Sequence, residues 1–390
     1  MGLTKFKNIW VKKFLIGETR KKVIDKVKIR KSRKPGNIIK NAGVETRKTG
    51  LFQKNQKRIL ILKLDHMGDF IVAIPAMMKL KARYPYSDID VVVGSWNKPT
   101  AERLEIFSNI FTLDFFKKNP SVSPSLEGEE LETFLDELGP YDIAVDLRWH
   151  PESRKILAKV EAGIKAGYTT GNIMVDNSLD IAVPYRDWNF VKKPMSSTLL
   201  ELIDKIPCDV NDYLIFPPLS KNIKETPDAK IAIFPYAGRR VKEWGEENYK
   251  ELINILNLNK NIKVVNVYVP EGMGAAWTSP QNLNKIKINE GLDIAGLYDS
   301  LSENDACVSN DSMGGHIASY LGLKTLVIFG GTDDPSLWAP SFYDSQVIFR
   351  PLPCSPCHNI NKEDCKFNMA CFDGITPEMV YDRVIGLIAV

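Results

Sequence analysis

Residues 58–69 read RILILKLDHMGD and carry the strongest secondary-structure signal in the chain. Its first eight residues form a nearly continuous apolar run, as expected for a strand buried on both faces of a parallel sheet. A helical pattern begins at about Asp69, directly after a turn that contains Gly68. A strand, a turn and a helix in this order predict the first unit of a doubly wound α/β sheet.

The alternation of strands and helices continues through two series. The first is predicted to add strands near 89–94 and 141–147 and helices near 99–107 and 152–161. The second is predicted to have strands at 230–235, 263–269, 306–309 and 325–329, with helices that begin at Glu246, near Leu297 and at Ser312. Residues 212–228 contain three prolines and no periodic pattern, which indicates a linker. We therefore expect two Rossmann-like domains facing a cleft, with ligands beyond the carboxyl ends of the strands.

These boundaries divide the 390 residues into four parts. They are a basic N-terminal arm (1–57), a first domain (58–215), a second domain (216–375) and a C-terminal helix (376–390). The chain is longer than one hydrophobic core commonly supports, which agrees with two domains. The last helix begins with a good cap followed by proline, and it could cross back onto the first domain.

Charge is distributed unevenly along the chain. Residues 1–58 hold 19 lysines and arginines against three acidic residues, whereas the remainder holds 33 basic against 45 acidic residues. The arm also places Phe6, Ile9, Trp10 and Phe14 at near-helical spacing among lysines, a pattern suited to an anionic membrane surface. A solvated, partly disordered extension explains these residues equally well. Nucleic acid is not expected as a partner, because the arm lacks an interleaved aromatic and basic platform.

Asp69 follows the glycine turn and would lie at the ligand edge of the first sheet. A carboxylate there can accept the proton of a hydroxyl that attacks a substrate. The same residue type also caps helices and is favoured by the helix dipole, and spacing alone favours the cap.

A second polar turn, SNDSMGGH, occupies residues 309–316 after an apolar strand. Hydroxyls and backbone N–H groups at the start of a helix form an anion site suited to a diphosphate, and His316 could reach it. A capped helix with a hydrogen-bonded histidine is the alternative. A third strand end, FPYAGRRVKEW at 234–244, carries Arg239, Arg240 and Lys242, which could neutralise a diphosphate or form a solvated loop.

Four of the six cysteines lie in the loop 354–371. Cys354, Cys357, Cys365 and Cys371 could form a structural thiolate site for zinc or iron. No apolar run approaches the roughly 20 residues that span a bilayer, so we expect a cytoplasmic protein, peripheral at most on the inner face of the plasma membrane. Disulfides are disfavoured there. Cys208 and Cys307 are interpreted as core residues.

Taken together, these segments resemble glycosyltransferase family 9, the ADP-heptose:lipopolysaccharide heptosyltransferases. The resemblance covers about residue 58 to the C-terminus and rests on an ordered set of segments. These are ILILKLDHMGDFIVAIPA (59–76), VDLRWHPESRKILA (145–158), FPYAGRRVKEWGEENYKELI (234–253), VSNDSMGGHIASYLG (308–322), FGGTDDPSLWAP (329–340) and the cysteine loop. It implies the GT-B fold, with acceptor bound by the first domain and donor by the second.

The resemblance also implies roles for individual residues. Asp69 would be the general base. The donor nucleotide-sugar would contact Lys242, Asp311, Ser312, Gly314, His316 and, by a loose alignment, Glu271. Two residues depart from the family pattern: Ser312 stands where threonine is usual, and Met313 stands where glycine is usual and could narrow the phosphate pocket.

The implied reaction is an inverting transfer without a catalytic metal, from a nucleotide-sugar such as ADP-heptose to a lipid-linked or lipopolysaccharide glycan. Arg148, His150 and Arg154 follow a strand end and could bind an acidic acceptor or form a solvated helix start. Alternatives are a capsule, O-antigen or protein glycosyltransferase that uses another nucleotide-sugar, and a non-catalytic glycan assembly protein. A nicotinamide dehydrogenase is disfavoured, because no G-x-G-x-x-G follows the first strand.

Overall fold

The computed structural model describes residues 56–115, 129–185, 193–208, 228–277, 285–342 and 344–388. The chain divides into two units, 1–52 and 53–390, and every described residue belongs to the second. The predicted membrane-binding arm and most of the predicted linker therefore lie outside the described residues. Within the described ranges, no helix is long and apolar enough to cross a bilayer.

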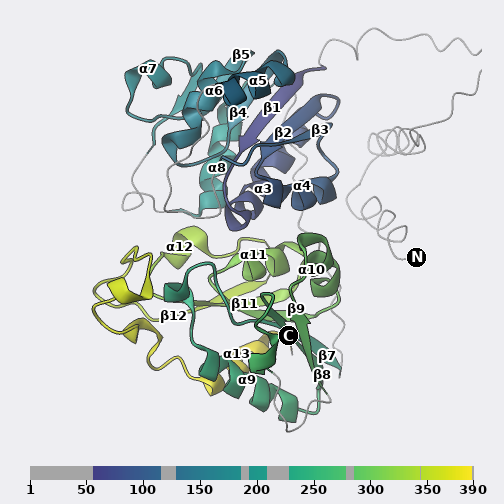
Figure 1. The fold of residues 1–390 in the computed structure, drawn as a ribbon, viewed down its shortest axis with the longest axis vertical. Coiled ribbons are helices and arrows are strands. Elements are labelled where there is room, and N and C mark those ends of the chain that lie inside the picture. Colours follow the sequence, from purple (N-terminus) through teal and green to yellow (C-terminus); the bar gives the residue numbers. More distant parts are fainter. Residues whose placement is uncertain are drawn as a thin grey trace, which may run out of the picture. The chain divides into compact units, whose positions relative to one another are not determined.

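The first half of this unit is built on a six-stranded parallel sheet (Figure 1). Its strands are β1 (Arg58–Lys63), β2 (Asp88–Val93), β3 (Asn109–Thr112), β4 (Tyr141–Asp146), β5 (Ala162–Tyr168) and β6 (Ile181–Val183). Its helices are α3 (Met67–Arg83), α4 (Lys98–Leu104), α5 (Glu129–Leu138), α6 (Arg154–Lys159), α7 (Ile173–Asp176) and α8 (Met195–Lys205). The strand order is β3-β2-β1-β4-β5-β6.

The second half repeats this plan. Its strands are β7 (Ala229–Phe234), β8 (Ile262–Val269), β9 (Ile286–Glu290), β10 (Ala306–Asn310), β11 (Lys324–Phe329) and β12 (Ser345–Phe349). Its helices are α9 (Glu246–Leu258), α10 (Ile294–Leu301), α11 (Met313–Tyr320), α12 (Pro335–Trp338) and α13 (Pro377–Ile388). The order β12-β11-β10-β7-β8-β9 is the same doubly wound topology read from the other edge.

Burial explains why the central strands form. In β1 every residue after Arg58 is buried, and all residues of β10 and β11 are buried, because helices cover both faces of these strands. The predicted α/β class and two Rossmann-like sheets are confirmed.

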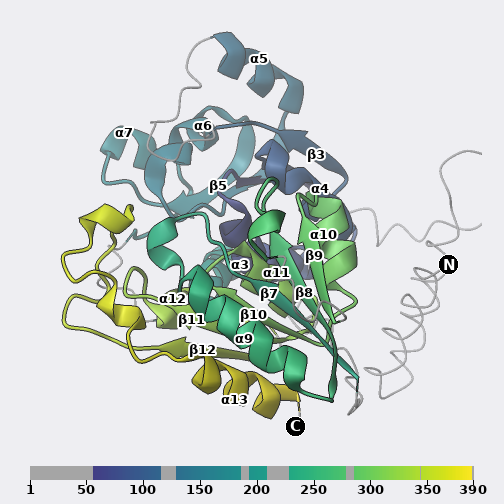
Figure 2. The ribbon, with the colours of Figure 1, turned by 60° about the horizontal axis from the view of Figure 1, so that its bottom comes forward.

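The C-terminal helix differs from the sequence expectation. Helix α13 packs on α9 and against β10 and β11, and the two helices lie side by side in Figure 2. Val380, Val384 and Leu387 bury their side chains in the apolar cluster of the second sheet. The helix packs on the second sheet and not, as it could have done, on the first domain, because its apolar side chains are buried against β10, β11 and α9.

Candidate active site

The topology marks two places for ligands. In each sheet the strand order reverses between two neighbouring parallel strands, β1 and β4 in the first and β7 and β10 in the second. Ligands of doubly wound sheets bind beyond the carboxyl ends of such strands. Both cavities described below lie at these positions.

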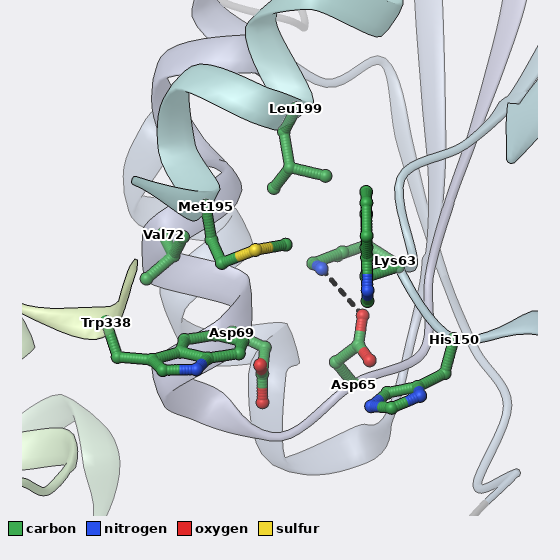
Figure 3. A pocket seen from close by; sticks show the side chains of 9 residues that line it. Lys63, Asp65, Asp69, Val72, His150, Met195, Leu199 and Trp338 are labelled. Atoms are coloured by element: carbon green, nitrogen blue, oxygen red, sulfur yellow. Dashed lines mark ion pairs between the residues drawn. The ribbon is translucent and has the colours of Figure 1, made fainter. Parts of the chain in front are cut away.

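A small cavity of about 20 Å³ lies at the switch point of the first sheet. Its charged and polar walls are Lys63, Asp65, Asp69 and His150, and its apolar walls are Val72, Trp149, Met195, Leu199 and Trp338. Figure 3 shows Asp69 and Trp338 beside each other and Met195 and Leu199 projecting from α8. This volume holds about one water molecule, so a sugar ring can enter only if the walls separate.

Asp69 lies in the first turn of α3, whose N-cap is His66. Asp69 is therefore not the capping residue that spacing alone favoured. Burial raises the pKa of its carboxyl, and the nearby carboxylate of Asp65 raises this pKa further. A carboxylate with a raised pKa is a stronger base than an exposed aspartate, which suits proton transfer near neutral pH.

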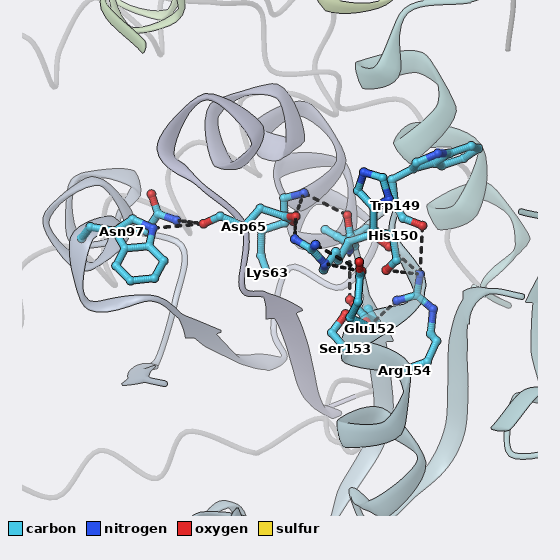
Figure 4. Close-up of polar contacts among 12 residues, drawn as sticks. Lys63, Asp65, Asn97, Trp149, His150, Glu152, Ser153 and Arg154 are labelled. Atoms are coloured by element: carbon cyan, nitrogen blue, oxygen red, sulfur yellow. Dashed lines mark hydrogen bonds and ion pairs between the residues drawn. The ribbon is translucent and has the colours of Figure 1, made fainter. Parts of the chain in front are cut away.

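Asp65 is a functional candidate that the sequence reasoning missed. Its carboxylate pairs with Lys63 at 2.6 Å and with the guanidinium of Arg148 (Figure 4). Burial alone would raise the pKa of Asp65, but these two cations outweigh it and lower the pKa. Asp65 therefore stays ionised beside Asp69. The sequence signal that could have identified Asp65 is its position two residues after an apolar strand and next to the glycine turn.

Arg148 and Arg154 are buried, so they do not form the solvated helix start that was the alternative. The guanidinium of Arg148 contacts Asp65 and, at 3.2 Å, Glu152, and 7% of the residue is exposed. Arg154 is fully buried and pairs with the fully buried Asp146, so it cannot contact an acceptor. Both arginines hold the loop after β4, since Arg154 also donates to the carbonyls of Tyr168 and Arg148.

His150 lines the first cavity with Asp69. Burial lowers the pKa of its imidazole, and the neighbouring charge of Arg148 lowers it further. His150 is thus a neutral imidazole at neutral pH that lines the cavity. Of the three residues considered for acceptor binding, Arg148, His150 and Arg154, it is the one that lines the cavity.

A larger cavity of about 420 Å³ lies at the switch point of the second sheet. Its volume is in the range of small-molecule sites. The lining residues are Phe234, Tyr236, Ala237, Gly238, Tyr268, Val269, Pro270, Glu271, Asn289, Gly291, Leu292, Leu297, Ser312, Met313 and Gly314. Glu271, Ser312 and Gly314 were predicted to bind the donor, and Met313 lines the same cavity.

Lys242 and Asp311 lie next to this cavity in one ionic cluster. The ammonium of Lys242 pairs with Asp311 and, at 2.7 Å, with Asp333, which also pairs with Arg239. Burial alone would lower the pKa of Lys242, but the two carboxylates outweigh it and raise the pKa. Lys242 is therefore a fixed cation at the end of the loop that borders the cavity.

The turn before α11 is held to β7 by Asn310. Its amide donates to the carbonyl of Pro235 at 2.9 Å and accepts from the backbone of Trp244 at 3.0 Å. Ser312 is the N-cap of α11 without a capping hydrogen bond, and its buried hydroxyl has no hydrogen-bond partner among the described residues. A hydroxyl with an unused donor and acceptor at a helix N-terminus suits an anion.

His316 lies one turn into α11 and is buried. Burial lowers the pKa of its imidazole to about 4, so it is neutral at pH 7. Helix α11 packs on α3, and a Cβ placed on Gly68 would lie 3.5 Å from Cδ2 of His316, so the glycine turn before Asp69 lies against this helix. The turns of the two sheets therefore meet at Gly68 and His316.

The metal site predicted in the cysteine loop stays a prediction. Cys354, Cys357, Cys365 and Cys371 are free thiols, and burial raises the pKa of Cys371. Across the described ranges, no group of three or more His, Cys, Asp or Glu side chains is arranged to hold a metal ion. Cys307 is buried in the core as expected.

Comparison with known proteins gives a consistent family. A sequence model of glycosyltransferase family 9 (heptosyltransferase) matches residues 139–367. Lipopolysaccharide heptosyltransferase 1 of Pseudomonas aeruginosa is 22% identical over 362 residues, covering 85% of this chain and 98% of that protein.

Solved structures share the fold. The E. coli heptosyltransferase WaaC with ADP has a TM-score of 0.64 at 14% identity, covering 85% of this chain and 99% of that one. The glycosyltransferase family 9 structure from Veillonella parvula has a TM-score of 0.68 at 16% identity, covering 85% of this chain and 97% of that one. Two parallel six-stranded sheets with helices match the GT-B fold of these proteins.

Proposed function

Because this chain belongs to glycosyltransferase family 9 and is a glycosyltransferase, we propose that it moves heptose from ADP-heptose to a lipopolysaccharide-type glycan with inversion. The observation that carries the proposal is the contact between the Gly68–Asp69 turn and His316. It brings a partly buried carboxylate of the first half to the helix that borders the nucleotide-sized cavity of the second.

The donor assignment is supported by the larger cavity and its polar end. The hydroxyl of Ser312 and the N-terminal N–H groups of α11 can bind the diphosphate. Lys242 can neutralise its charge once it exchanges one of its carboxylate partners, Asp311 or Asp333, for a phosphate oxygen. The relative WaaC was solved with ADP, and the Pseudomonas relative is named a lipopolysaccharide heptosyltransferase. These names support ADP-heptose as donor and lipopolysaccharide as acceptor.

In the proposed reaction, the acceptor hydroxyl attacks the anomeric carbon from the face opposite the nucleotide. Asp69 takes the hydroxyl proton as the new carbon–oxygen bond forms and the bond to the diphosphate breaks. ADP leaves with both electrons of that bond, and Lys242 and the N-terminus of α11 stabilise its negative charge.

The acceptor would bind in the small cavity after it widens. His150 can donate or accept a hydrogen bond there, and the indole of Trp338 gives an apolar wall beside Asp69. Arg148 is better suited to positioning Asp65 than to binding the acceptor, since its guanidinium is committed to Asp65 and Glu152. Binding of the 1–57 arm to the inner face of the plasma membrane stays a prediction.

Substitution Asp69→Asn tests the base. The amide keeps the size of the side chain but cannot accept the proton, so we expect turnover to fall on the order of 10²- to 10⁴-fold while ADP binding is unchanged. Turnover is measured as ADP release from ADP-heptose with lipopolysaccharide acceptor, and ADP binding by calorimetry. Glu102→Gln, at an exposed site on α4, is the matched control and should keep wild-type turnover. Near-normal turnover in Asp69→Asn would remove this carboxylate from the mechanism.

A further inference from the structure

The larger cavity has two chemically different ends. Ser312, Met313 and Gly314 border it at the helix N-terminus, where the proposed diphosphate binds. The other end is formed by the carboxyl ends of β8 and β9 and by α10, where Tyr268, Asn289 and Leu297 line it. A nucleoside diphosphate with its phosphates at the first end places its base toward the second.

Asn289 is the buried polar side chain at this second end, with 8% of the residue exposed. Its amide nitrogen Nδ2 donates to Oδ1 of Asn266 and to the carbonyl of Lys287, both at 3.4 Å. Its Oδ1 accepts from no group in the part of the chain that the structure describes. The side chain therefore keeps one unused acceptor in a cavity wall.

Asn289, Asn266 and Asn304 form a relay of hydrogen bonds, and the contacts of Asn304 fix which amide donates and which accepts along it. Asn304 donates through Nδ2 to the backbone carbonyls of Ser300 and Leu301, both at 3.1 Å, and a carbonyl can only accept. Oδ1 of Asn304 is thus the acceptor for Nδ2 of Asn266, at 2.7 Å. Oδ1 of Asn266 is then left to accept from Asn289.

We infer that Asn289 is a specificity-determining residue that reads the nucleobase through Oδ1 and selects a base with an exocyclic amino group, as adenine has. The inference deepens the proposed function and rests on it, because it assumes that the cavity binds a nucleoside diphosphate. An amino group donates to this oxygen. A carbonyl at the same place, as in hypoxanthine or uracil, puts two acceptors together and leaves both unpaired.

ADP and inosine diphosphate give the sharpest comparison, because hypoxanthine carries a carbonyl where adenine carries its amino group. We expect the full chain to bind ADP about 10- to 100-fold more tightly than inosine diphosphate in calorimetric titrations. Asn289→Leu removes the acceptor and should reduce this ratio to near one, mainly through weaker ADP binding. Lys287→Ala, at an exposed site two residues earlier on β9, should keep the wild-type ratio.

A second variant covers the case in which leucine disturbs the relay. Asn289→Gln keeps an amide whose nitrogen can donate to Asn266 and whose oxygen can accept from the base, so it should still prefer ADP. Equal binding of both nucleotides by the wild type, or an unchanged preference in Asn289→Leu, would overturn the inference and leave the proposed function standing. Binding of neither nucleotide by the wild type would overturn the proposed function itself.

Discussion

At the residue scale, the environment of Asp69 is set by charges from three segments. Burial has the largest effect on the pKa of the Asp69 carboxyl and raises it, and the charge of Asp65 raises it further. Lys63, His66 and Arg148 lower this pKa. Asp69 must be ionised to accept a proton, so kcat/KM should fall as the pH falls through this raised pKa. The charge of Asp65 therefore moves the acidic limb of the pH profile toward neutral pH.

Substitution Asp65→Asn should shift that limb to lower pH by about one unit. The change removes a negative charge near Asp69 and leaves Lys63 and Arg148 without their shared carboxylate, and both effects lower the pKa of Asp69. The measurement is kcat/KM from pH 4 to 9. Glu152→Gln, which removes the other carboxylate paired with Arg148, is the control and should shift the limb less. An acidic limb that does not move in Asp65→Asn would mean that a group other than Asp69 is titrating.

The sequence could predict Asp69 but not the pair that surrounds it. Asp69 follows a glycine turn after an apolar strand, which is a local signal. Arg148 lies 83 residues from Asp65, and only the parallel pairing of β1 with β4 brings their side chains together. For the same reason Arg148 was predicted to bind an acceptor, although its guanidinium is paired inside the protein.

At the element scale, α11 depends on two glycines that allow close packing. A Cβ on Gly314 would lie 2.4 Å from the ring of Phe234, and one on Gly315 would lie 2.4 Å from the hydroxyl of Ser309. Gly314 was predicted from the resemblance as a donor contact. Its position also lets the N-terminus of α11 approach β7, whose end borders the donor cavity.

Substitution Gly314→Ala should therefore weaken ADP binding by at least about tenfold and lower the free energy of unfolding by about 1–3 kcal/mol, because the added methyl overpacks against Phe234. Binding is measured by calorimetry and stability by urea unfolding. Gly386→Ala is the matched control, since this exposed glycine of α13 has no atom within 4 Å of the added methyl. The control should be neutral or stabilise by up to about 1 kcal/mol. Equal effects of the two substitutions would refute the packing argument.

Strands that are buried on both faces were easier to predict from the sequence than strands that are partly exposed. The central strands β1, β4, β7 and β10 were predicted within one or two residues, because strands buried on both faces read as apolar runs. The strands β3, β5, β6, β9 and β12 were missed. In β5 two glycines interrupt the apolar pattern, and Gly167 lies against the side chain of Arg154, a contact that no local pattern reveals.

At the scale of the whole described unit, the two sheets share an apolar cluster. It contains Ile59 and Phe70 of the first half together with Phe234, Tyr298 and Ile317 of the second. Arg103 of α4 adds a polar link, since it donates to Asp299 of α10 at 2.8 Å and lies over the ring of Tyr298. The sequence predicted two domains, but it gave no sign that their cores are continuous.

A continuous core predicts one cooperative unfolding transition, because neither sheet can lose its packing without exposing apolar surface of the other. Calorimetry of the full chain should give one main peak whose calorimetric and van't Hoff enthalpies agree. ADP at about 100 times its Kd should stabilise the whole transition by about 2.7 kcal/mol, although its proposed site lies on the second sheet alone. Arg103→Ala should lower the Tm by a few degrees without splitting the peak, since one exposed link contributes little beside the shared apolar cluster. Two resolved peaks, with ADP raising the Tm of only one, would show instead that the two halves unfold separately. The contact between Gly68 and His316 would then form and break independently of either core.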